Sequence, residues 1–190
     1  MKYFSRSYTF LVILVMGLIL GACTSARPSE EKEVAEPSAS TESELRVTLE
    51  APASLPSGEA VTVKFTLTNN TAERLYVLKW FTPLEGLAGE IFRVERDGEA
   101  IPYGGILAKR GAPLPDEYIL IDPGTSVSAE VDLATAYDFS RAGDYTIEFL
   151  SPVVSHIARE ETAKASTLED LKPVQIPSNT VTVQIVDSAK

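Results

Sequence analysis

Short runs of alternating apolar and polar residues begin at Leu45 and continue almost to the end of the chain. In residues 61–68, every second side chain is apolar and the others are Thr or Lys, as in a strand with one buried face. Gly, Pro, Asn and Asp separate these runs, and no long stretch has helical periodicity. The pattern predicts an all-β domain with nine strands, at residues 45–49, 61–68, 75–81, 91–96, 99–101, 118–121, 127–133, 145–150 and 181–186.

Local motifs within this pattern favour an immunoglobulin-like antiparallel β-sandwich. Asp97-Gly98, between two of the strands, is a strong signal for a tight hairpin. Gly143-Asp144-Tyr145 resembles the corner of immunoglobulin-like domains, where a tyrosine hydroxyl bonds back to the backbone. Trp80, on the third strand, would be the buried aromatic residue between the sheets. Because the chain has one cysteine, the sandwich would lack an internal disulfide.

An irregular insertion interrupts the last hairpin, at residues 152–173. Within it, Thr167 is followed three residues later by Asp170, a spacing typical of a helix N-terminus, and Leu168 and Leu171 lie on one face. The insertion is therefore predicted to hold one short helix.

The first residues have the layout of a signal peptide. Lys2 and Arg6 precede an apolar run at residues 10–20, which ends in small residues. The apolar stretch up to Cys23 has 14 residues, fewer than the roughly 20 that a membrane-spanning helix needs. Leu20-Gly21-Ala22-Cys23 resembles the bacterial lipobox, so we expect residues 1–22 to be removed and Cys23 to be lipidated.

An acidic, serine-rich segment follows, and we expect residues 23–44 to be a lipidated cysteine and a disordered tether. Residues 45–190 would form the folded domain. The lipoprotein resemblance implies three acyl chains, palmitate among them, which suffice for stable membrane anchoring. Thr24 stands where such lipoproteins carry Asp for inner-membrane retention, so the resemblance favours the outer membrane, on its periplasmic or surface side, if the organism has one.

Composition excludes several function classes. With a net charge of -10, the chain lacks the positive electrostatic field that nucleic-acid binding requires, so we expect no nucleic-acid partner. One histidine excludes any site with two imidazoles, and no phosphate-binding glycine loop or dedicated calcium loop is present in the sequence. We therefore expect no metal ion and no cofactor.

Candidate catalytic groups are few. His156 has Ser155 beside it but lies in the irregular insertion, so we expect a surface loop histidine and not part of a catalytic triad. Two loop carboxylates could form a glycosidase-type pair, although the sequence does not give their separation. The candidates for such a pair, which we expect to be solvated charges, are Glu85, Glu90, Asp116 and Glu117. No residue is predicted to be catalytic.

Two loops are the best candidates for binding a partner. The first follows Trp80 and carries Leu84 and Leu87, which would pack beneath the loop or contact a partner. The second, residues 108–115, is stiffened by prolines and carries a basic pair in an acidic domain. The candidate contact residues of the two loops are Leu84, Leu87, Lys109, Arg110, Pro113 and Pro115, with a solvated connection as the simpler interpretation of the second loop.

A family resemblance covers most of residues 45–186. The residues that carry it are Asn69-Asn70, Leu78-Lys79-Trp80, Thr82-Pro83, Gly86, residues 92–98, Pro102-Tyr103, Lys109-Arg110, Tyr118, Pro123-Gly124, Asp132-Leu133, Tyr137-Asp138, Gly143-Asp144-Tyr145, Ser178-Asn179 and Val181. Together they resemble the N-terminal immunoglobulin-like region of bacterial deuterolysin-type (aspzincin) metalloendopeptidases. In that family, this region is a propeptide that assists folding and restrains the protease.

The resemblance does not extend to the catalytic half, because an HExxH motif needs two histidines. It implies a non-catalytic lipoprotein whose domain restrains or chaperones a secreted metalloprotease in trans. Two alternatives stay open: a structural or assembly lipoprotein that recognises a neighbour by strand addition, and a carboxylate enzyme.

Overall fold

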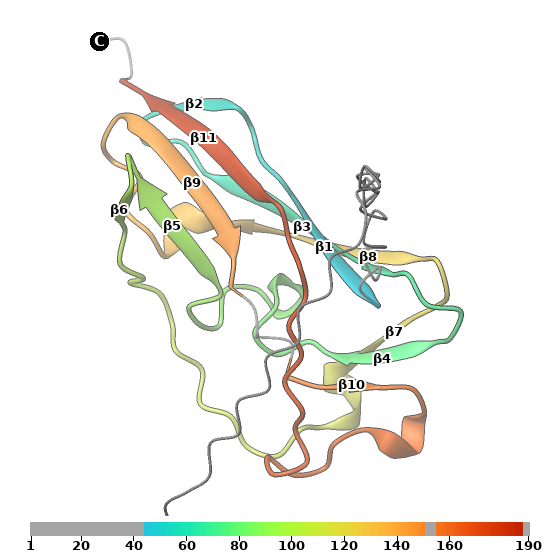
Figure 1. Ribbon diagram of the computed structural model, residues 1–190. Coiled ribbons are helices and arrows are strands. Elements are labelled where there is room, and N and C mark those ends of the chain that lie inside the picture. Colours follow the sequence, from blue (N-terminus) through green and yellow to red (C-terminus); the bar gives the residue numbers. More distant parts are fainter. Residues whose placement is uncertain (1–43, 151–154, 188–190) are drawn as a thin grey trace, which may run out of the picture. The chain divides into compact units, whose positions relative to one another are not determined.

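The alternating segments form antiparallel strands that assemble into three sheets (Figure 1). The computed structural model describes residues 44–150 and 155–187. In these residues the first sheet has the order β1-β3-β8, and a five-stranded sheet has the order β2-β11-β9-β5-β6. Their bounds are β1 Leu45–Glu50, β2 Ser54–Pro56, β3 Thr62–Asn69, β5 Phe92–Arg96, β6 Glu99–Ala100, β8 Ser126–Asp132, β9 Gly143–Phe149 and β11 Thr180–Val186. The third sheet, β10-β4-β7, consists of β4 Leu75–Leu78, β7 Tyr118–Ile121 and β10 Ile157–Ala158.

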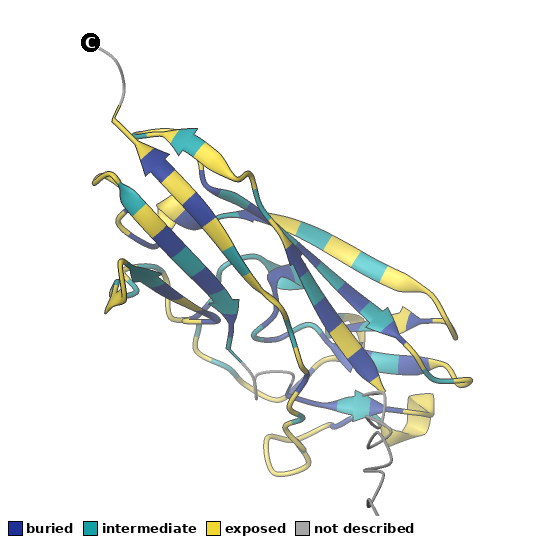
Figure 2. Ribbon diagram, turned by 45° about the horizontal axis from the view of Figure 1, so that its top comes forward, coloured by how far each residue is buried: buried dark blue, intermediate teal, exposed yellow. Residues whose placement is uncertain are grey.

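The main core lies between the first sheet and the five-stranded sheet. Buried and less buried residues alternate along β3 and β9, so each strand turns one row of side chains inward (Figure 2). Phe65 of β3 meets Phe149 of β9 across the core, with ring centroids 5.2 Å apart. The period-two pattern thus produces a sandwich, because each amphipathic sheet can bury its apolar face only against the other.

A tyrosine corner is present where the sequence predicts it. The Tyr145 hydroxyl donates a hydrogen bond of 2.8 Å to the carbonyl oxygen of Arg141, four residues upstream. The ring is fully buried and lies 4.7 Å from that of Phe139. This arrangement is a hallmark of immunoglobulin-like sandwiches, and it confirms the predicted fold class.

The predicted strands are confirmed, with changes at their ends. The Asp97-Gly98 hairpin has positive φ at both central residues, 51° and 86°, as a tight two-residue hairpin requires. The predicted strand at residues 75–81 ends earlier, at Leu78, because Phe81 has a φ of 56° and Thr82 turns the chain back onto the carbonyl of Lys79. A short 3-10 helix, η1 (Pro83–Glu85), follows.

Trp80 is buried, but it does not lie between the two main sheets. Its side chain is 2% exposed and packs with Leu78 and Tyr118 in a second, smaller cluster. The expectation of an inter-sheet tryptophan was therefore wrong. The reason is the alternation of side chains along this segment: Leu75 and Val77 pack in the main core, whereas Leu78 and Trp80 belong to the alternate row, which faces the smaller cluster.

The insertion before β11 contains β10 and a 3-10 helix, η4 (Glu161–Ala163). The predicted contact between Thr167 and Asp170 does form, since the Thr167 hydroxyl donates to Asp170 Oδ2 at 2.9 Å. It closes only a turn, so the helix predicted at this point was wrong. Two short strands, β2 and β10, were not predicted. Two further 3-10 helices, η2 (Pro115–Glu117) and η3 (Leu133–Thr135), lie in connections.

Candidate protein-interaction site

The two loops that the sequence singles out contact each other. Glu85, in η1, forms an ion pair with Arg110 of the second loop. The two side chains are only 15% and 18% exposed. The guanidinium of Arg110 also lies over two aromatic rings, 5.0 Å from the centroid of Trp80 and 5.4 Å from that of Phe81.

A second carboxylate completes this group. Glu117 accepts a hydrogen bond from Trp80 Nε1 at 2.8 Å and another from the Leu114 backbone N–H at 2.7 Å. Glu85 similarly accepts from the Phe81 backbone N–H at 2.8 Å. We refer to Trp80, Phe81, Glu85, Arg110 and Glu117 as the Arg110 cluster.

Burial sets the electrostatics of the cluster. Loss of solvent raises the pKa of Glu85 above its ordinary value, and the Phe81 N–H and the Arg110 guanidinium oppose part of this rise. Both carboxylates bind donors of the protein itself. The cluster is therefore built to hold two loops together, and it does not present a free carboxylate pair.

The six predicted contact residues differ in exposure. Leu84 and Leu87 are half-buried and pack against the main core, and Pro113 is buried. Arg110 is occupied by the cluster described above. Lys109 and Pro115 remain exposed.

A more exposed apolar feature lies just before Lys109 and was missed at the sequence level. The side chains of Ile106 and Leu107 are both 73% exposed, more than the other large hydrophobic residues described. Two adjacent aliphatic residues after Gly104-Gly105, in a stretch without strand periodicity, are the signal that could have revealed them. We refer to residues 104–108 as the Ile106 loop.

Hydrogen bonds hold this loop at both ends. The Gly104 N–H donates to the carbonyl of Ala136 at 2.8 Å, and the Ala108 N–H donates to the carbonyl of Ala88 at 2.9 Å. The Tyr103 hydroxyl donates to the carbonyl of Ile106 at 2.8 Å, beneath the loop's tip. The two exposed side chains thus project from a fixed backbone.

His156 is buried, so the expectation of a surface histidine was wrong. The Lys172 N–H donates to its Nδ1 at 3.3 Å, so Nε2 carries the proton and donates to the Ala163 carbonyl at 3.1 Å. The ring packs edge-on against Tyr118, 6.2 Å away. Both nitrogens are used in holding the insertion, which indicates a structural role.

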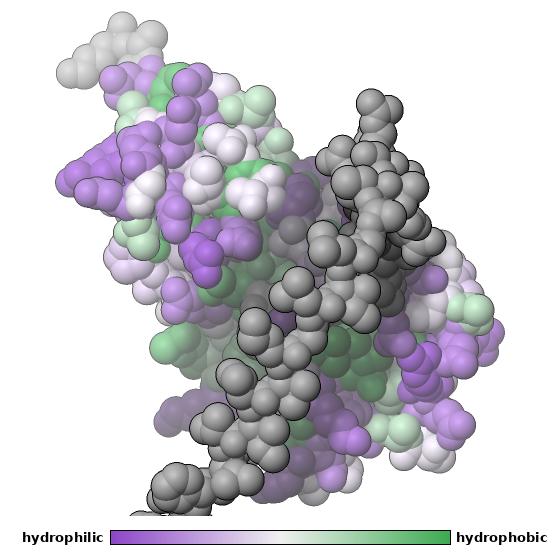
Figure 3. Space-filling view, in the orientation of Figure 1, coloured by the Kyte–Doolittle hydropathy of each residue, from purple (hydrophilic) through white to green (hydrophobic). Residues whose placement is uncertain are grey.

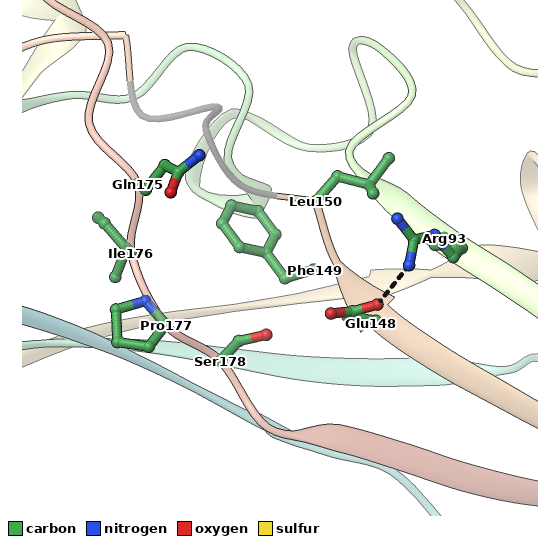
Figure 4. Close-up of a pocket in the computed structure, with 8 residues that line it drawn as sticks. All are labelled: Arg93, Glu148, Phe149, Leu150, Gln175, Ile176, Pro177 and Ser178. Carbon is green, nitrogen blue, oxygen red and sulfur yellow. Dashed lines mark hydrogen bonds and ion pairs between the residues drawn. The ribbon is translucent and has the colours of Figure 1, made fainter.

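An open pocket of about 470 Å³ lies beside β9 and the chain that leads into β11 (Figure 4). Its one carboxylate, Glu148, forms an exposed ion pair of 3.0 Å with Arg93. The pocket therefore does not supply the two close carboxylates that a glycosidase would use. Within residues 44–150 and 155–187, no three or more His, Cys, Asp or Glu side chains gather as metal ligands would.

On the face seen in Figure 3, hydrophilic residues predominate and apolar ones form smaller areas between them. No helix among the described residues has the length and apolar character needed to cross a membrane. The signal peptide, Cys23 and the tether up to residue 43 lie outside the described residues, so their assignment stays a prediction. Glu44, the last residue of the predicted tether, is described: it pairs with Arg159, and its carbonyl accepts a hydrogen bond from the Asn70 N–H at 2.9 Å.

Comparison with known proteins points to proteases. The chain is 34% identical over 120 residues to an extracellular protease of Aeromonas hydrophila. The aligned stretch covers 63% of this chain and 34% of that protein. It is 36% identical over 98 residues to a neutral protease 2 homologue of Uncinocarpus reesii, covering 50% of this chain and 27% of that protein. The chain thus spans about a third or less of the length of these relatives.

No protein-family model matches the chain. Among solved structures, the CARDB domain of a Pyrococcus furiosus protein is a distant neighbour, with a TM-score of 0.34 and 12% identity over 76% of this chain and 94% of that domain. The sequence comparisons confirm, over part of the chain, the expected similarity to proteases. This protein contains an immunoglobulin-like β-domain similar to part of extracellular and neutral proteases.

Proposed function

We propose that this protein is a membrane-anchored, non-catalytic lipoprotein whose immunoglobulin-like domain binds a secreted metalloendopeptidase in trans. The observation that carries the proposal is the 34% identity to about a third of an extracellular protease, over a stretch that covers most of this chain. In deuterolysin-type proteases, which the sequence resembles, the corresponding region is a propeptide. A separate copy of such a domain would restrain the mature enzyme or assist its folding.

The surface of the domain supports a binding role. The Ile106 loop presents two large aliphatic side chains on a backbone held by hydrogen bonds, so little conformational entropy is lost when a partner covers them. Lys109 follows directly and is exposed. Apolar anchors beside a charge are typical of the centre and rim of a protein interface.

Lipidation of Cys23 would keep this activity at the cell envelope. The tether at residues 24–44 would extend on the order of 25 Å as a flexible coil, enough to hold the domain clear of the lipid headgroups. In the outer membrane, an anchored domain would meet a protease during its secretion.

Enzyme kinetics test the proposal. The full chain, purified in detergent, is added at increasing concentration to a deuterolysin-type metalloendopeptidase, and hydrolysis of a peptide substrate is followed. We expect a saturable fall in rate, or a higher yield of active enzyme when the protease is refolded in its presence. A serine endopeptidase serves as the control and should be unaffected. No change in either assay at micromolar concentration would refute a protease partner.

The edge of β8 favours a second candidate, a structural or assembly lipoprotein. Among the described residues, β8 pairs with β3 alone, and its seven residues contain no proline. Such an edge can accept a strand from a neighbouring protein. Slow hydrogen exchange of β8 amides in native envelopes, lost on purification, would favour this candidate over protease binding.

A further inference from the structure

We propose that the Ile106 loop enters the peptide-binding cleft of the partner endopeptidase, with Ile106 and Leu107 as the anchoring side chains. This inference rests on the proposed function and names the surface that would carry it. The connection from β6 to η2, residues 101–114, contains no helix or strand and runs in yellow-green along the lower left of Figure 1. At its middle, the side chains of Ile106 and Leu107 are exposed and therefore accessible to a partner.

The loop keeps its shape without a partner. Its two ends are bonded to the carbonyls of Ala136 and Ala88, as described above, and the Tyr103 hydroxyl supports the carbonyl of Ile106 from below. Tyr103 is itself held by an edge-on contact with the ring of Tyr137, at 5.4 Å. A loop fixed in this way binds with a smaller loss of entropy than a flexible peptide of the same sequence.

Close packing at Gly105 adds to this rigidity. A Cβ atom at this position would lie 2.5 Å from Tyr103 Oη and 2.9 Å from the Cβ of Ala136. Only glycine lets the backbone pass so near its support. The tip is thus pressed onto the domain while the next two side chains point into solvent.

The Arg110 cluster fixes the chain on the other side of the loop. Because Arg110 is held between Glu85 and the rings of Trp80 and Phe81, the residues after Lys109 cannot swing away freely. The Ile106 loop is therefore held by Tyr103, which precedes it and packs on Tyr137, and by the Arg110 cluster, which follows it.

The chemistry of the loop fits a cleft that binds peptides. Residues 101–108 carry no charge, although the chain as a whole has a net charge of -10. Endopeptidases bind substrate as an extended segment, using backbone hydrogen bonds and pockets for successive side chains. Ile106 and Leu107, two adjacent exposed aliphatic side chains, fit such pockets. An anionic membrane is less favoured, because it would repel the acidic domain.

The test compares two variants of the full chain in binding to the endopeptidase. Ile106→Ser combined with Leu107→Ser removes both anchors, and Leu168→Ser changes a leucine that is 47% exposed in the insertion. We expect the double variant to bind the endopeptidase about 30-fold more weakly or worse, because both interface anchors are lost. Leu168→Ser should leave the affinity unchanged. Both should melt at the wild-type temperature, since the altered side chains are exposed.

Competition with a small zinc-binding inhibitor of the protease tests whether the contact lies in the cleft. We expect the inhibitor to displace the wild-type protein from the protease. Equal binding of the double variant and the wild type, or no displacement, would overturn the inference and leave the proposed function standing. Absence of wild-type binding would overturn both. A membrane role is tested with a Cys23→Ser chain and anionic phosphatidylglycerol vesicles. If this chain binds the vesicles, the double substitution abolishes that binding, and neither chain affects the protease, the loop would be assigned to the membrane instead.

Discussion

Arg110 has a different role in the structure from the one that the sequence predicts. In the sequence it forms a basic pair with Lys109, and both are candidates for contact with a partner. In the folded domain, Lys109 is exposed, whereas Arg110 pairs with Glu85 and stacks on two aromatic rings. A loop without periodicity gives no sign of which of two adjacent residues faces inward, so this difference could not be predicted.

The two basic residues should respond differently to substitution. Arg110→Ala leaves the largely buried Glu85 carboxylate without its cation, so we expect a loss of about 2 to 3 kcal/mol in the free energy of unfolding. Lys109→Ala should change it by less than about 0.5 kcal/mol. Urea denaturation followed by circular dichroism measures both. Equal midpoints for the two variants would contradict a structural role for Arg110.

The raised pKa of Glu85 gives a pH dependence of known sign. Because the folded-state pKa lies above the ordinary 4.5, the folded protein holds this proton more tightly than the unfolded chain does. Its contribution to stability is complete below pH 4.5 and is lost as the pH rises through the raised pKa. As the pH rises from 4.5 through the raised pKa, the unfolding free energy of the wild type should therefore fall relative to that of Glu85→Gln. A difference that does not vary with pH would contradict the prediction.

At the scale of elements, periodicity determined what could be predicted. The strands with alternating burial were found, since one face of each packs on the core. The short strands β2 and β10 were missed, because β2 pairs in parallel with the distant β11 and β10 pairs with β4, and neither has enough residues to show a pattern. Thr167 and Asp170 formed their contact but no helix, because local capping does not supply a face to bury.

The sequence did not show which sheet face Trp80 occupies, because most residues in both alternate rows of residues 75–81 are apolar; in the structure Trp80 lies in the row of Leu78, and Leu75 and Val77 form the row in the main core. The contacts of the candidate site were likewise hidden. The sequence identified both loops, but it did not show that Glu85 and Arg110 join them. Nor did it show that the most exposed apolar residues, Ile106 and Leu107, lie just before Lys109.

Trp80 should contribute to stability by linking these two loops. Trp80→Ala removes a buried ring, its hydrogen bond to Glu117 and the surface beneath Arg110, so we expect a loss of about 3 to 5 kcal/mol and a lower melting temperature. Leu168→Ala, at an exposed position, is the matched control and should have little effect. An unchanged melting temperature in Trp80→Ala would show that the cluster does not hold the fold.

At the scale of the whole molecule, the proposed function combines an anchor with a rigid binding surface. The anchor depends on Cys23, the single cysteine of the chain. We expect Cys23→Ser to move the protein from the detergent phase to the aqueous phase in cell fractionation, since one thiol carries the lipid attachment. Retention of the variant in the detergent phase would contradict lipidation at this residue.

Calorimetric titration of the purified full chain into a deuterolysin-type metalloendopeptidase tests the proposed function most directly. If the domain binds the enzyme through apolar anchors on a rigid loop, the titration will show saturable binding at micromolar concentration or tighter, with a negative change in heat capacity. A chain with a folded β-sheet spectrum that releases no heat of binding at these concentrations would contradict protease binding, and the structural lipoprotein would become the better explanation.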